Sequence, residues 1–558
     1  KARGVTERSL PPADLVIRGA RVFLVFTNEW IEADVAVVDG VVAGIGDYEG
    51  DDLLDASGRY LVPGFIDAHM HVESSKLLVD EFARLVLPFG TTAVVADPHE
   101  IANVLGTDGV HWLLDACEDL PLDVYFMASS CVPASAFESP RRALSTGDLE
   151  GLLHRRRVLG LAEMMNFPGV IAGDESELAK LRLADHVDGH APDVRGKRLA
   201  AYAAAGIESD HEASTLEEGR ERLRAGMWLL IREASAARNL RALIPLAQEY
   251  GPSRIAFCTD DREPEHIAAD GHINSMVRDT VALGIPPEDA LVMATLNPAC
   301  YHRLDRLGAI APGYRADLLL LPDLESFLPE LVLKAGRPVP EIDAVPVPDW
   351  VRHTVRVGEI GPGAFRIPWR GGAARVIGLV PDQIVTDSLV EEPAVEDGQA
   401  IADPARDLAK IAVLERHLGT GRVGLGFVRG FGLERGAFAA TLAHDAHNLI
   451  VVGVDDLAME RAALRLVELG GGLVVVDREA VVAELPLPVA GLLSDRPLAE
   501  VLAASEAINA AVQSLGVRFP HPFQVLAFLA LSVIPSLKIT DRGLVDVDRF
   551  QLVPLAAE

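Results

Sequence analysis

The feature that most constrains the fold of this 558-residue chain is a succession of eight short apolar runs between about residues 61 and 261. Each run ends in polar residues, and most are followed by a stretch of helical character. Strands that alternate with helices predict a parallel sheet, and eight repeats in roughly 250 residues predict a (β/α)8 barrel of the TIM type. The runs are LVPGFIDAHMH, TTAVVADPHE, LDVYFMASS, LGLAEMMN, HVDGHAP, GIESDHEA, MWLLIREAS and IAFCTDD.

Sequence on either side of these runs predicts a small β-domain that is split in two. Residues 15–62 contain short β-branched segments broken by Gly and Asp, a pattern typical of antiparallel strands and hairpins. A matching segment at 307–321, LGAIAPGYRADLLLL, can complete the same sheet if the region between folds as an insertion. We therefore expect a small β-sandwich made from residues 1–60 and 307–370, with a Pro-rich linker in the second part, around a barrel at 61–306.

A further α/β or α+β domain is expected at 375–558, where apolar segments alternate with helix-like stretches. The chain carries 51 Lys plus Arg against 82 Asp plus Glu, a net charge of −31, so we expect no nucleic acid and no anionic membrane as partners. The longest apolar runs fall short of the roughly 18 residues of a membrane span. Four sparse cysteines fit a reducing cytoplasm. A small-molecule substrate is the expected partner.

The strongest chemical signal lies at the end of the first run, where His69 and His71 flank a single residue. Alternate residues of a strand point the same way, so both imidazoles can reach one metal ion. Other runs end in imidazole or carboxylate groups at equivalent places: Glu163, Asp188, His190, Asp210, His211, Glu212, Asp260 and Asp261. The C-terminal ends of barrel strands form the face that carries the chemistry, so this shared position indicates a metal site.

These ligands outnumber those of one catalytic zinc, which usually takes three protein ligands and a water. Four histidines with two carboxylates fit two metals better, and the two oxygens of Glu163 can bridge them. Imidazole and carboxylate without thiolate suit zinc, iron and manganese alike, so the residues leave the identity of the metal open.

At these positions the sequence resembles the amidohydrolase superfamily of metal-dependent hydrolases. PGFIDAHMHVESS, the histidines of the fifth and sixth runs and the aspartate of the eighth carry this similarity. DPHEIANVLG (97–106), AEMMNFPGV (162–170), DGHAP, ESDHEA, CTDDR and AHDAHN (443–448) further resemble the bacterial-type adenine deaminases, over nearly the whole chain.

The resemblance implies adenine as the substrate, hypoxanthine and ammonia as products, and a role in purine salvage. It also implies two divalent ions per chain, with manganese favoured over iron or zinc, and we expect a homo-oligomer. The implied ligands are His69, His71, Glu163, His190, His211 and Asp260.

Replacement of the amino group at C6 of a purine requires an activated water and two proton transfers. Asp260 is the expected base and later the donor to ammonia, with its neighbour Asp261 as the alternative. Glu163 takes part through its bridging position, and His99, in the loop after Pro98, is the best-placed candidate to protonate N1. Glu73, Glu100 and Glu212 are candidate substrate contacts, and Glu73 and Glu100 can equally begin helices, where a carboxylate is favourable.

His444, Asp445 and His447 form a polar cluster in the last domain. They can form a lid over the barrel mouth, an extra metal site, or a polar turn whose side chains cap their own backbone. The function also has alternatives: a closely similar site can cleave an N-acyl sugar or a cyclic amide, and a hydrolase barrel without metals can act as a non-catalytic scaffold. The complete set of six ligands argues against the scaffold.

Overall fold

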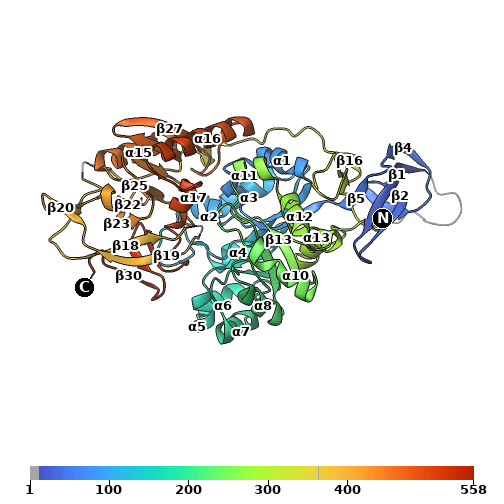
Figure 1. The fold of residues 1–558 in the computed structure, drawn as a ribbon, viewed down its shortest axis with the longest axis horizontal. Coiled ribbons are helices and arrows are strands. Elements are labelled where there is room, and N and C mark those ends of the chain that lie inside the picture. Colours follow the sequence, from blue (N-terminus) through green and yellow to red (C-terminus); the bar gives the residue numbers. More distant parts are fainter. Residues whose placement is uncertain (1–11, 362, 382, 558) are drawn as a thin grey trace.

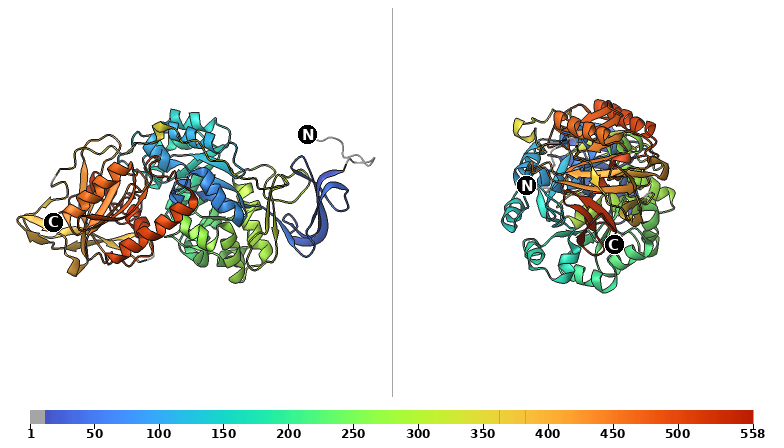
Figure 2. Two further views of the ribbon diagram at one scale, coloured as in Figure 1. Left: turned by 90° about the horizontal axis from the view of Figure 1, so that it is seen from above. Right: turned by 90° about the vertical axis from the view of Figure 1, so that its left-hand side faces the viewer.

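The computed structural model describes residues 12–361, 363–381 and 383–557 and places three units in a row (Figure 1). The β-unit contains strands β1–β5 and β14–β16, the barrel unit contains strands β6–β13 and their helices, and the C-terminal unit contains strands β17–β30. Figure 2 shows the same row from above, with the barrel unit in the middle. Among the described residues, no helix combines the length and the apolar character that a membrane span requires.

Eight parallel strands form the barrel unit, one in each of the predicted apolar runs. They are β6 (Phe65–Met70), β7 (Thr91–Ala96), β8 (Asp123–Ala128), β9 (Val158–Met164), β10 (Val187–Gly189), β11 (Ser209–Asp210), β12 (Trp228–Arg232) and β13 (Ile255–Cys258). Strand pairing gives two sheets, β10-β9-β8-β7-β6 and β11-β12-β13. They meet at one seam through a bridge between Met70 and Asp260, and at the other through Glu208 N–H, which donates to the Val187 carbonyl at 3.0 Å.

This arrangement is a TIM-like barrel domain, as predicted, although ladder pairing does not run continuously around it. The pairing is interrupted at two seams, between β13 and β6, which share an isolated bridge, and between β10 and β11, which are only three and two residues long and pair on one side each. The strands β6 and β7 are buried along their whole length, because helices cover the outside and side chains fill the inside.

The helices of the barrel unit are mostly short, and several begin with a side-chain cap. Ser145 accepts a hydrogen bond from Asp148 N–H at the start of α4, and Thr215 does the same for Glu218 N–H at the start of α8. The helices are η1 (Val72–Ser75), α1 (Val79–Val86), η2 (Leu87–Phe89), α2 (His99–Leu105), α3 (Thr107–Ala116), α4 (Thr146–Leu153), α5 (Phe167–Ala172), α6 (Glu175–Leu181), α7 (Gly196–Ala204), α8 (Leu216–Arg224), α9 (Leu240–Leu243), α10 (Pro245–Tyr250), α11 (Pro264–Asp270), α12 (Ile273–Ala282), α13 (Pro287–Ala294) and α14 (Leu296–Tyr301).

The β-unit joins strands from before and after the barrel, as predicted. Its strands are β1 (Ala13–Leu24), β2 (Glu29–Val38), β3 (Val41–Ile45), β4 (Gly50–Asp55), β5 (Tyr60–Pro63), β14 (Leu318–Leu321), β15 (Leu331–Lys334) and β16 (Arg337–Pro338). The order is β16-β15-β14-β5-β1-β2-β3, with β4 paired to β1. The long strand β1 pairs with β4 along its first half and with β5 along its second, and this connects all eight strands into one hydrogen-bonded sheet.

The C-terminal unit is built on a second eight-stranded sheet, in the order β19-β18-β23-β22-β25-β24-β26-β27. Pairing is antiparallel except between β18 and β23, so the unit is α+β. Its elements are η3 (Asp349–Val351), β17 (Ile367–Pro368), β18 (Ala374–Leu379), β19 (Thr386–Glu391), β20 (Ala394–Glu396), β21 (Gln399–Ile401), η4 (Pro404–Arg406), β22 (Leu408–Leu414), β23 (Val423–Arg429), β24 (Ala437–Ala440), β25 (Leu449–Gly453), α15 (Asp456–Leu469), β26 (Gly472–Asp477), β27 (Ala480–Pro486), α16 (Leu498–Ser514), α17 (Pro522–Phe528), β28 (Leu537–Thr540), β29 (Gly543–Asp546) and β30 (Gln551–Val553).

Successive side chains of β22 point to opposite faces of the sheet, and their packing shows how the C-terminal unit attaches to the barrel. Ala412 and Leu414 pack into a core beneath α15, whereas Ile411 and Val413 on the opposite face belong to a large apolar cluster that also contains barrel residues. The helix α16 contacts α1 and α11 of the barrel. The C-terminal unit therefore shares a continuous core with the barrel and lies against its mouth.

Candidate active site

The six predicted metal ligands converge at the C-terminal ends of the barrel strands, and all six side chains are buried. Glu163 lies at their centre. Its Oε1 is 3.8 Å from His69 Nε2 and 3.6 Å from His71 Nε2. Its Oε2 is 2.7 Å from His190 Nδ1 and 3.3 Å from His211 Nε2. Each oxygen of this one carboxylate thus faces two of the predicted imidazole ligands.

Asp260 completes the group from the end of β13. Its Oδ1 is 3.1 Å from His71 Nε2, and its Oδ2 accepts a 2.8 Å hydrogen bond from Arg232 Nη1. Burial alone would raise the pKa of Asp260, but the hydrogen bond with His71 and the charge of Arg232 hold that pKa well below its ordinary value. The Asp260 backbone N–H donates to the His69 carbonyl at 3.0 Å, which fixes the carboxylate beside the two histidines of β6.

Hydrogen bonds from neighbouring residues orient the six predicted ligands. The Tyr202 hydroxyl accepts from His190 N–H at 2.9 Å and donates to the Met164 carbonyl at 2.8 Å. The Asp67 carboxylate, inside the barrel, accepts from the backbone N–H of His69 at 3.2 Å and of Thr259 at 3.1 Å. Burial raises the pKa of Asp67 to about 7. These contacts hold the strand ends in register where the ligands leave them.

Whether the six predicted ligands fit a metal can be tested on their buried nitrogen atoms, several of which have no hydrogen-bond partner among the described residues. These atoms are His69 Nε2, His190 Nε2 and His211 Nδ1. An unpaired buried polar atom costs about 1–3 kcal/mol. Imidazole nitrogens and carboxylate oxygens are ligands that divalent transition metals take. The ligand atoms of two trios lie within 4.8 Å of one another: His69–His71–Glu163 and His69–His211–Asp260. The residues present therefore fit a divalent metal centre.

His99 lies beside the six ligands, at the start of α2. Its ring centroid is 4.5 Å from that of His71, and its Nδ1 is 3.0 Å from Asp97 Oδ2 and 3.5 Å from Glu163 Oε1. Burial lowers the pKa of His99, whereas Cys131, Asp97 and Asp445 raise it, and the pKa ends well above its ordinary value. These neighbouring acidic groups therefore favour the protonated form of His99.

Glu73 and Glu100 are buried near His99, but neither lines the cavity above the six ligands. Glu73 Oε1 accepts a hydrogen bond from Ile101 N–H at 3.0 Å, and Glu100 Oε1 accepts one from Ser74 Oγ at 3.1 Å. Burial and the charge of Glu100 raise the pKa of Glu73 to about 7. Both carboxylates lie at helix starts, in η1 and α2, as one of our two interpretations expected.

A small cavity lies over the six ligands and takes its wall from both the barrel and the C-terminal unit. Its lining residues are His71, His99, Glu163, Met165, His190, His211, Glu212, Arg232, Asp260, Asp261, Ile384, His444, Asp445, Phe528 and Leu531. Of the predicted polar cluster, His444 and Asp445 line this cavity. His447 lies behind them, with its Nε2 3.2 Å from Glu100 Oε2.

Arg232 is a cavity residue that the sequence analysis did not select. It ends β12, is buried, and donates hydrogen bonds to both carboxylate oxygens of Glu212 as well as to Asp260. The signal was present, because the run MWLLIREAS places Arg232 at the same strand end as the acidic groups of other runs. Arg232 was missed because the prediction considered imidazole and carboxylate groups as ligands, and not the guanidinium that pairs with the carboxylates.

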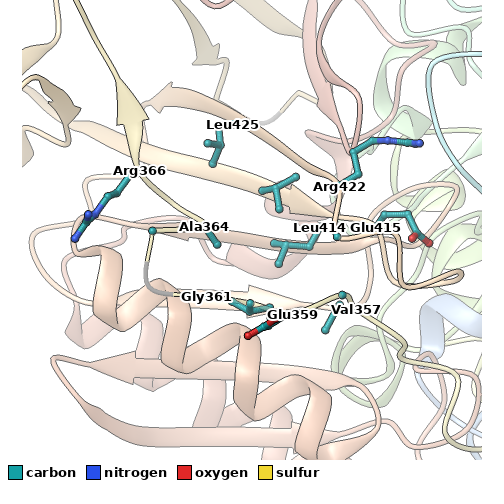
Figure 3. Close-up of a pocket in the computed structure, with 14 residues that line it drawn as sticks. Val357, Glu359, Gly361, Ala364, Arg366, Leu414, Glu415, Arg422 and Leu425 are labelled. Carbon is teal, nitrogen blue, oxygen red and sulfur yellow. The ribbon is translucent and has the colours of Figure 1, made fainter.

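Further hollows lie outside the cavity above the ligands. A cavity of about 840 Å³ between the barrel and the C-terminal unit shares Glu212, Arg232 and Ile384 with the cavity above the ligands, and so adjoins it. Figure 3 shows a separate hollow in the C-terminal unit, lined by residues that include Val357 and Arg422. Its described lining contains no histidine, so the chemistry belongs at the barrel mouth.

Comparisons with known proteins cover nearly the whole chain. Residues 60–361 match the amidohydrolase family, and residues 383–551 match the adenine deaminase C-terminal domain. The chain is 49% identical over 554 residues to adenine deaminase 2 of Carboxydothermus hydrogenoformans, and the aligned region covers 98% of this chain and 97% of that protein. It is 47% identical over 550 residues to the adenine deaminase of Oleidesulfovibrio alaskensis, and the aligned region covers 98% of this chain and 96% of that protein. A solved amidohydrolase from an environmental sample of the Sargasso Sea is 14% identical, with a TM-score of 0.46 over 60% of this chain and 95% of that one.

Proposed function

Since the chain belongs to the adenine deaminase family of amidohydrolases, we propose that the convergent side chains at its barrel mouth carry out the hydrolysis of adenine. Membership of this family makes the chain an enzyme that cleaves a C–N bond and converts adenine to hypoxanthine and ammonia. It also implies the use of a divalent metal. The proposed ligands of two metal ions are His69, His71, Glu163, His190, His211 and Asp260.

The observation that carries the proposal is the position of Glu163. One oxygen faces His69 and His71, and the other faces His190 and His211, so Glu163 would hold metal together with both pairs of histidines. Divalent ions in such a site supply the acidification of water that makes it a nucleophile near neutral pH. The chain itself supplies the ligands, the proton carriers and a small cavity lined by buried side chains.

Asp260 is the proposed base. Arg232 donates to its Oδ2, which keeps the carboxylate ionised, while Oδ1 lies among the imidazoles of His69 and His71. From there Oδ1 can take a proton from the water that attacks C6 and deliver it to the departing amino group.

His99 is the proposed carrier of the second proton. The two hydrogens of the water end on ammonia and on N1 of hypoxanthine, so the site needs a second group that can protonate N1. The imidazolium of His99, which lies 3.5 Å from Glu163 and lines the cavity, has the charge and the position for this step.

The remaining predicted residues receive supporting roles in the proposal. Glu212 lines the cavity and acts on substrate together with its partner Arg232. Glu73 and Glu100 brace the chain segments after β6 and β7 that present His71 and His99. The cluster of His444, Asp445 and His447 acts as part of a lid, since it lies over the barrel mouth.

The finer organisation is proposed on similar grounds. We place the domain limits at 1–60, 61–306, 307–370 and 375–558, with the eight strands acting as one (β/α)8 barrel. Oxygen and nitrogen ligands without thiolate are compatible with manganese. Four free cysteines favour a reducing cytoplasm, where purine salvage by a homo-oligomer would take place.

Adenine turnover after metal exchange tests the proposal. The protein is stripped with a chelator, reconstituted separately with manganese, iron or zinc, and assayed for loss of adenine absorbance and release of ammonia. We expect no turnover by the apoprotein and restoration at two metal ions per chain. Saturation at one ion would contradict the two-metal site. Hydrolysis of an N-acyl sugar or a cyclic amide, or a purely structural role, lacks support, because the full-length relatives are adenine deaminases.

A further inference from the structure

The cavity above the six ligands is too small for the substrate that the proposed function requires. Its volume is about 20 Å³, which is room for about one water molecule. Adenine is a fused bicyclic base and needs several times that space. The six proposed ligands must stay together to hold metal, so the additional space has to come from another part of the cavity wall.

A hollow large enough for adenine adjoins this small cavity. The cavity between the barrel and the C-terminal unit has a volume of about 840 Å³, within the range of roughly 300–1,000 Å³ that is typical of ligand-binding cavities. Residues that line this outer cavity include Asp193, Arg238, Val385 and Phe519. The first three are exposed, so solvent reaches the outer cavity. A substrate that arrives from solvent therefore has a place to enter beside the metal ligands.

Few side chains separate the two cavities. Among the described residues, Glu212, Arg232 and Ile384 line both of them. Arg232 donates hydrogen bonds to both carboxylate oxygens of Glu212 and to Asp260, and these three charged side chains are buried. Displacing them would break charge-assisted hydrogen bonds away from water, which is costly. Ile384, the apolar member of the wall, is therefore the one that can give way.

The backbone of Ile384 is tied down, so the movable part is its side chain. The Nζ of the buried Lys538 donates one hydrogen bond to the Ile384 carbonyl at 2.7 Å and another to the Phe528 carbonyl at 3.0 Å. Two residues later, Thr386 Oγ1 donates to the Leu537 carbonyl at 2.8 Å. The half-buried side chain of Ile384 packs against an apolar cluster that contains Phe528. Because its backbone is held, Ile384 remains in the wall even when its side chain turns aside.

The proposed reaction places one edge of adenine at this wall. Asp260 is the proposed donor to the departing amino group, and its Oδ2 accepts the hydrogen bond from Arg232, which is part of the wall. We propose that adenine passes from the outer cavity to the metal ligands beside Ile384 and binds with its amino nitrogen toward that side chain, which thereby excludes purines with a larger amino substituent. This inference rests on the proposed function. An alkyl group on the amino nitrogen would overlap Ile384, whereas the same group on the five-membered ring would point elsewhere.

The experiment compares two isomeric probes, N6-propyladenine and 9-propyladenine. KM for adenine, and Ki of each probe against adenine, are measured for the wild-type protein, Ile384→Ala and Ile384→Val. The wild type should bind N6-propyladenine more weakly than adenine. In Ile384→Ala the ratio of the N6-propyladenine Ki to the adenine KM should fall roughly 10- to 200-fold, the range over which apolar pockets discriminate small differences in size. Ile384→Val should give an intermediate ratio, and the ratio for 9-propyladenine should change much less.

Ile360→Ala is the matched control. Ile360 is also a half-buried isoleucine of the C-terminal unit, but it lines the separate hollow of Figure 3. Its replacement should leave both ratios at their wild-type values. Metal content and denaturant unfolding are measured on each protein. If Ile384→Ala does not fold, Ile384→Val carries the test, because it shortens the side chain by only one methylene group.

The inference fails if the N6-propyladenine ratio of the Ile384 variants equals that of the wild type, or if it falls equally in Ile360→Ala. It also fails if the wild type binds N6-propyladenine as well as adenine. An equal gain for 9-propyladenine would contradict the orientation at the wall and overturn it. Loss of bound metal from Ile384→Ala would assign this side chain to support of the metal site and would equally overturn it. A wild-type protein that does not deaminate adenine would refute the proposed function itself, which is a different result.

Discussion

Replacement of Asp260 by asparagine separates its chemical role from its structural one. Asn keeps the shape of the side chain but cannot carry a proton between water and the leaving group. Proton transfer by a positioned group contributes about 10²- to 10⁴-fold to a rate, which is about 3–5 kcal/mol of activation free energy. The variant also weakens one 2.8 Å hydrogen bond from Arg232, worth about 1.5–3 kcal/mol for a charged pair, but Arg232 keeps both bonds to Glu212.

Two measurements on Asp260→Asn distinguish these effects. Steady-state turnover of adenine should fall 10²- to 10⁴-fold, whereas denaturant unfolding should show a loss of only about 1.5–3 kcal/mol. Metal content should stay near the wild-type value.

Asp261→Asn is the neighbouring comparison. Burial and the charge of Asp260 raise the pKa of Asp261, and its Oδ1 accepts a hydrogen bond from Ser74 that an amide oxygen can also accept. Because Asp261 is not the proposed proton carrier, turnover of Asp261→Asn should fall less than about tenfold. Turnover of Asp260→Asn within tenfold of the wild type, or a larger loss in Asp261→Asn, would refute the assignment of the base.

Three further predictions concern the surroundings of the site. Tyr202→Phe leaves His190 N–H and the Met164 carbonyl without their partner, so the free energy of unfolding should fall by about 1–3 kcal/mol in denaturant titrations; an unchanged value would contradict this bonding. Burial lowers the pKa of His190 but Glu212 and Glu163 raise it to about 9, so a divalent metal that binds at the proposed ligands should displace a proton; calorimetry with manganese should show proton release and an affinity for the apoprotein that increases with pH up to about 9. Burial lowers the pKa of Lys538 to about 7 from 10.5, so the unfolded chain binds more protons between these values, and stability should rise with pH above 7 in the wild type more than in Lys538→Met.

The barrel could be predicted from the sequence because its strands are buried on both faces. Such strands appear as uninterrupted apolar runs, and all eight runs contain one. The joining of β5 to β14 was predicted from the similar character of two segments more than 250 residues apart. The order of strands within the sheet was not predicted, because it depends on how the long strand β1 divides its partners between β4 and β5, and periodicity carries no information about partners.

The candidate site was predictable to the extent that its residues share a position on the strands. His69, His190 and Asp260 all lie at strand ends, and that regularity is visible in the sequence. His444 and Asp445 of the C-terminal unit were also among the candidates, as part of a possible lid. Ile384 and Phe528 were not, because they reach the cavity through tertiary docking that leaves no periodic signal. Arg232 was missed for another reason: it compensates charge, and the need for a buried cation appears only once the carboxylates are known to be buried together.

The pairing of β5 with β14 has a consequence for synthesis on the ribosome. Tyr60–Pro63 is translated early, and its neighbour Leu318–Leu321 follows only after the entire barrel sequence. At about 5–20 residues per second, the nascent N-terminal sheet waits on the order of ten to fifty seconds with one edge open. An open edge invites pairing with other chains. Slower elongation through the barrel codons should therefore increase aggregation of the newborn protein, and chaperones that shield strand edges should relieve it.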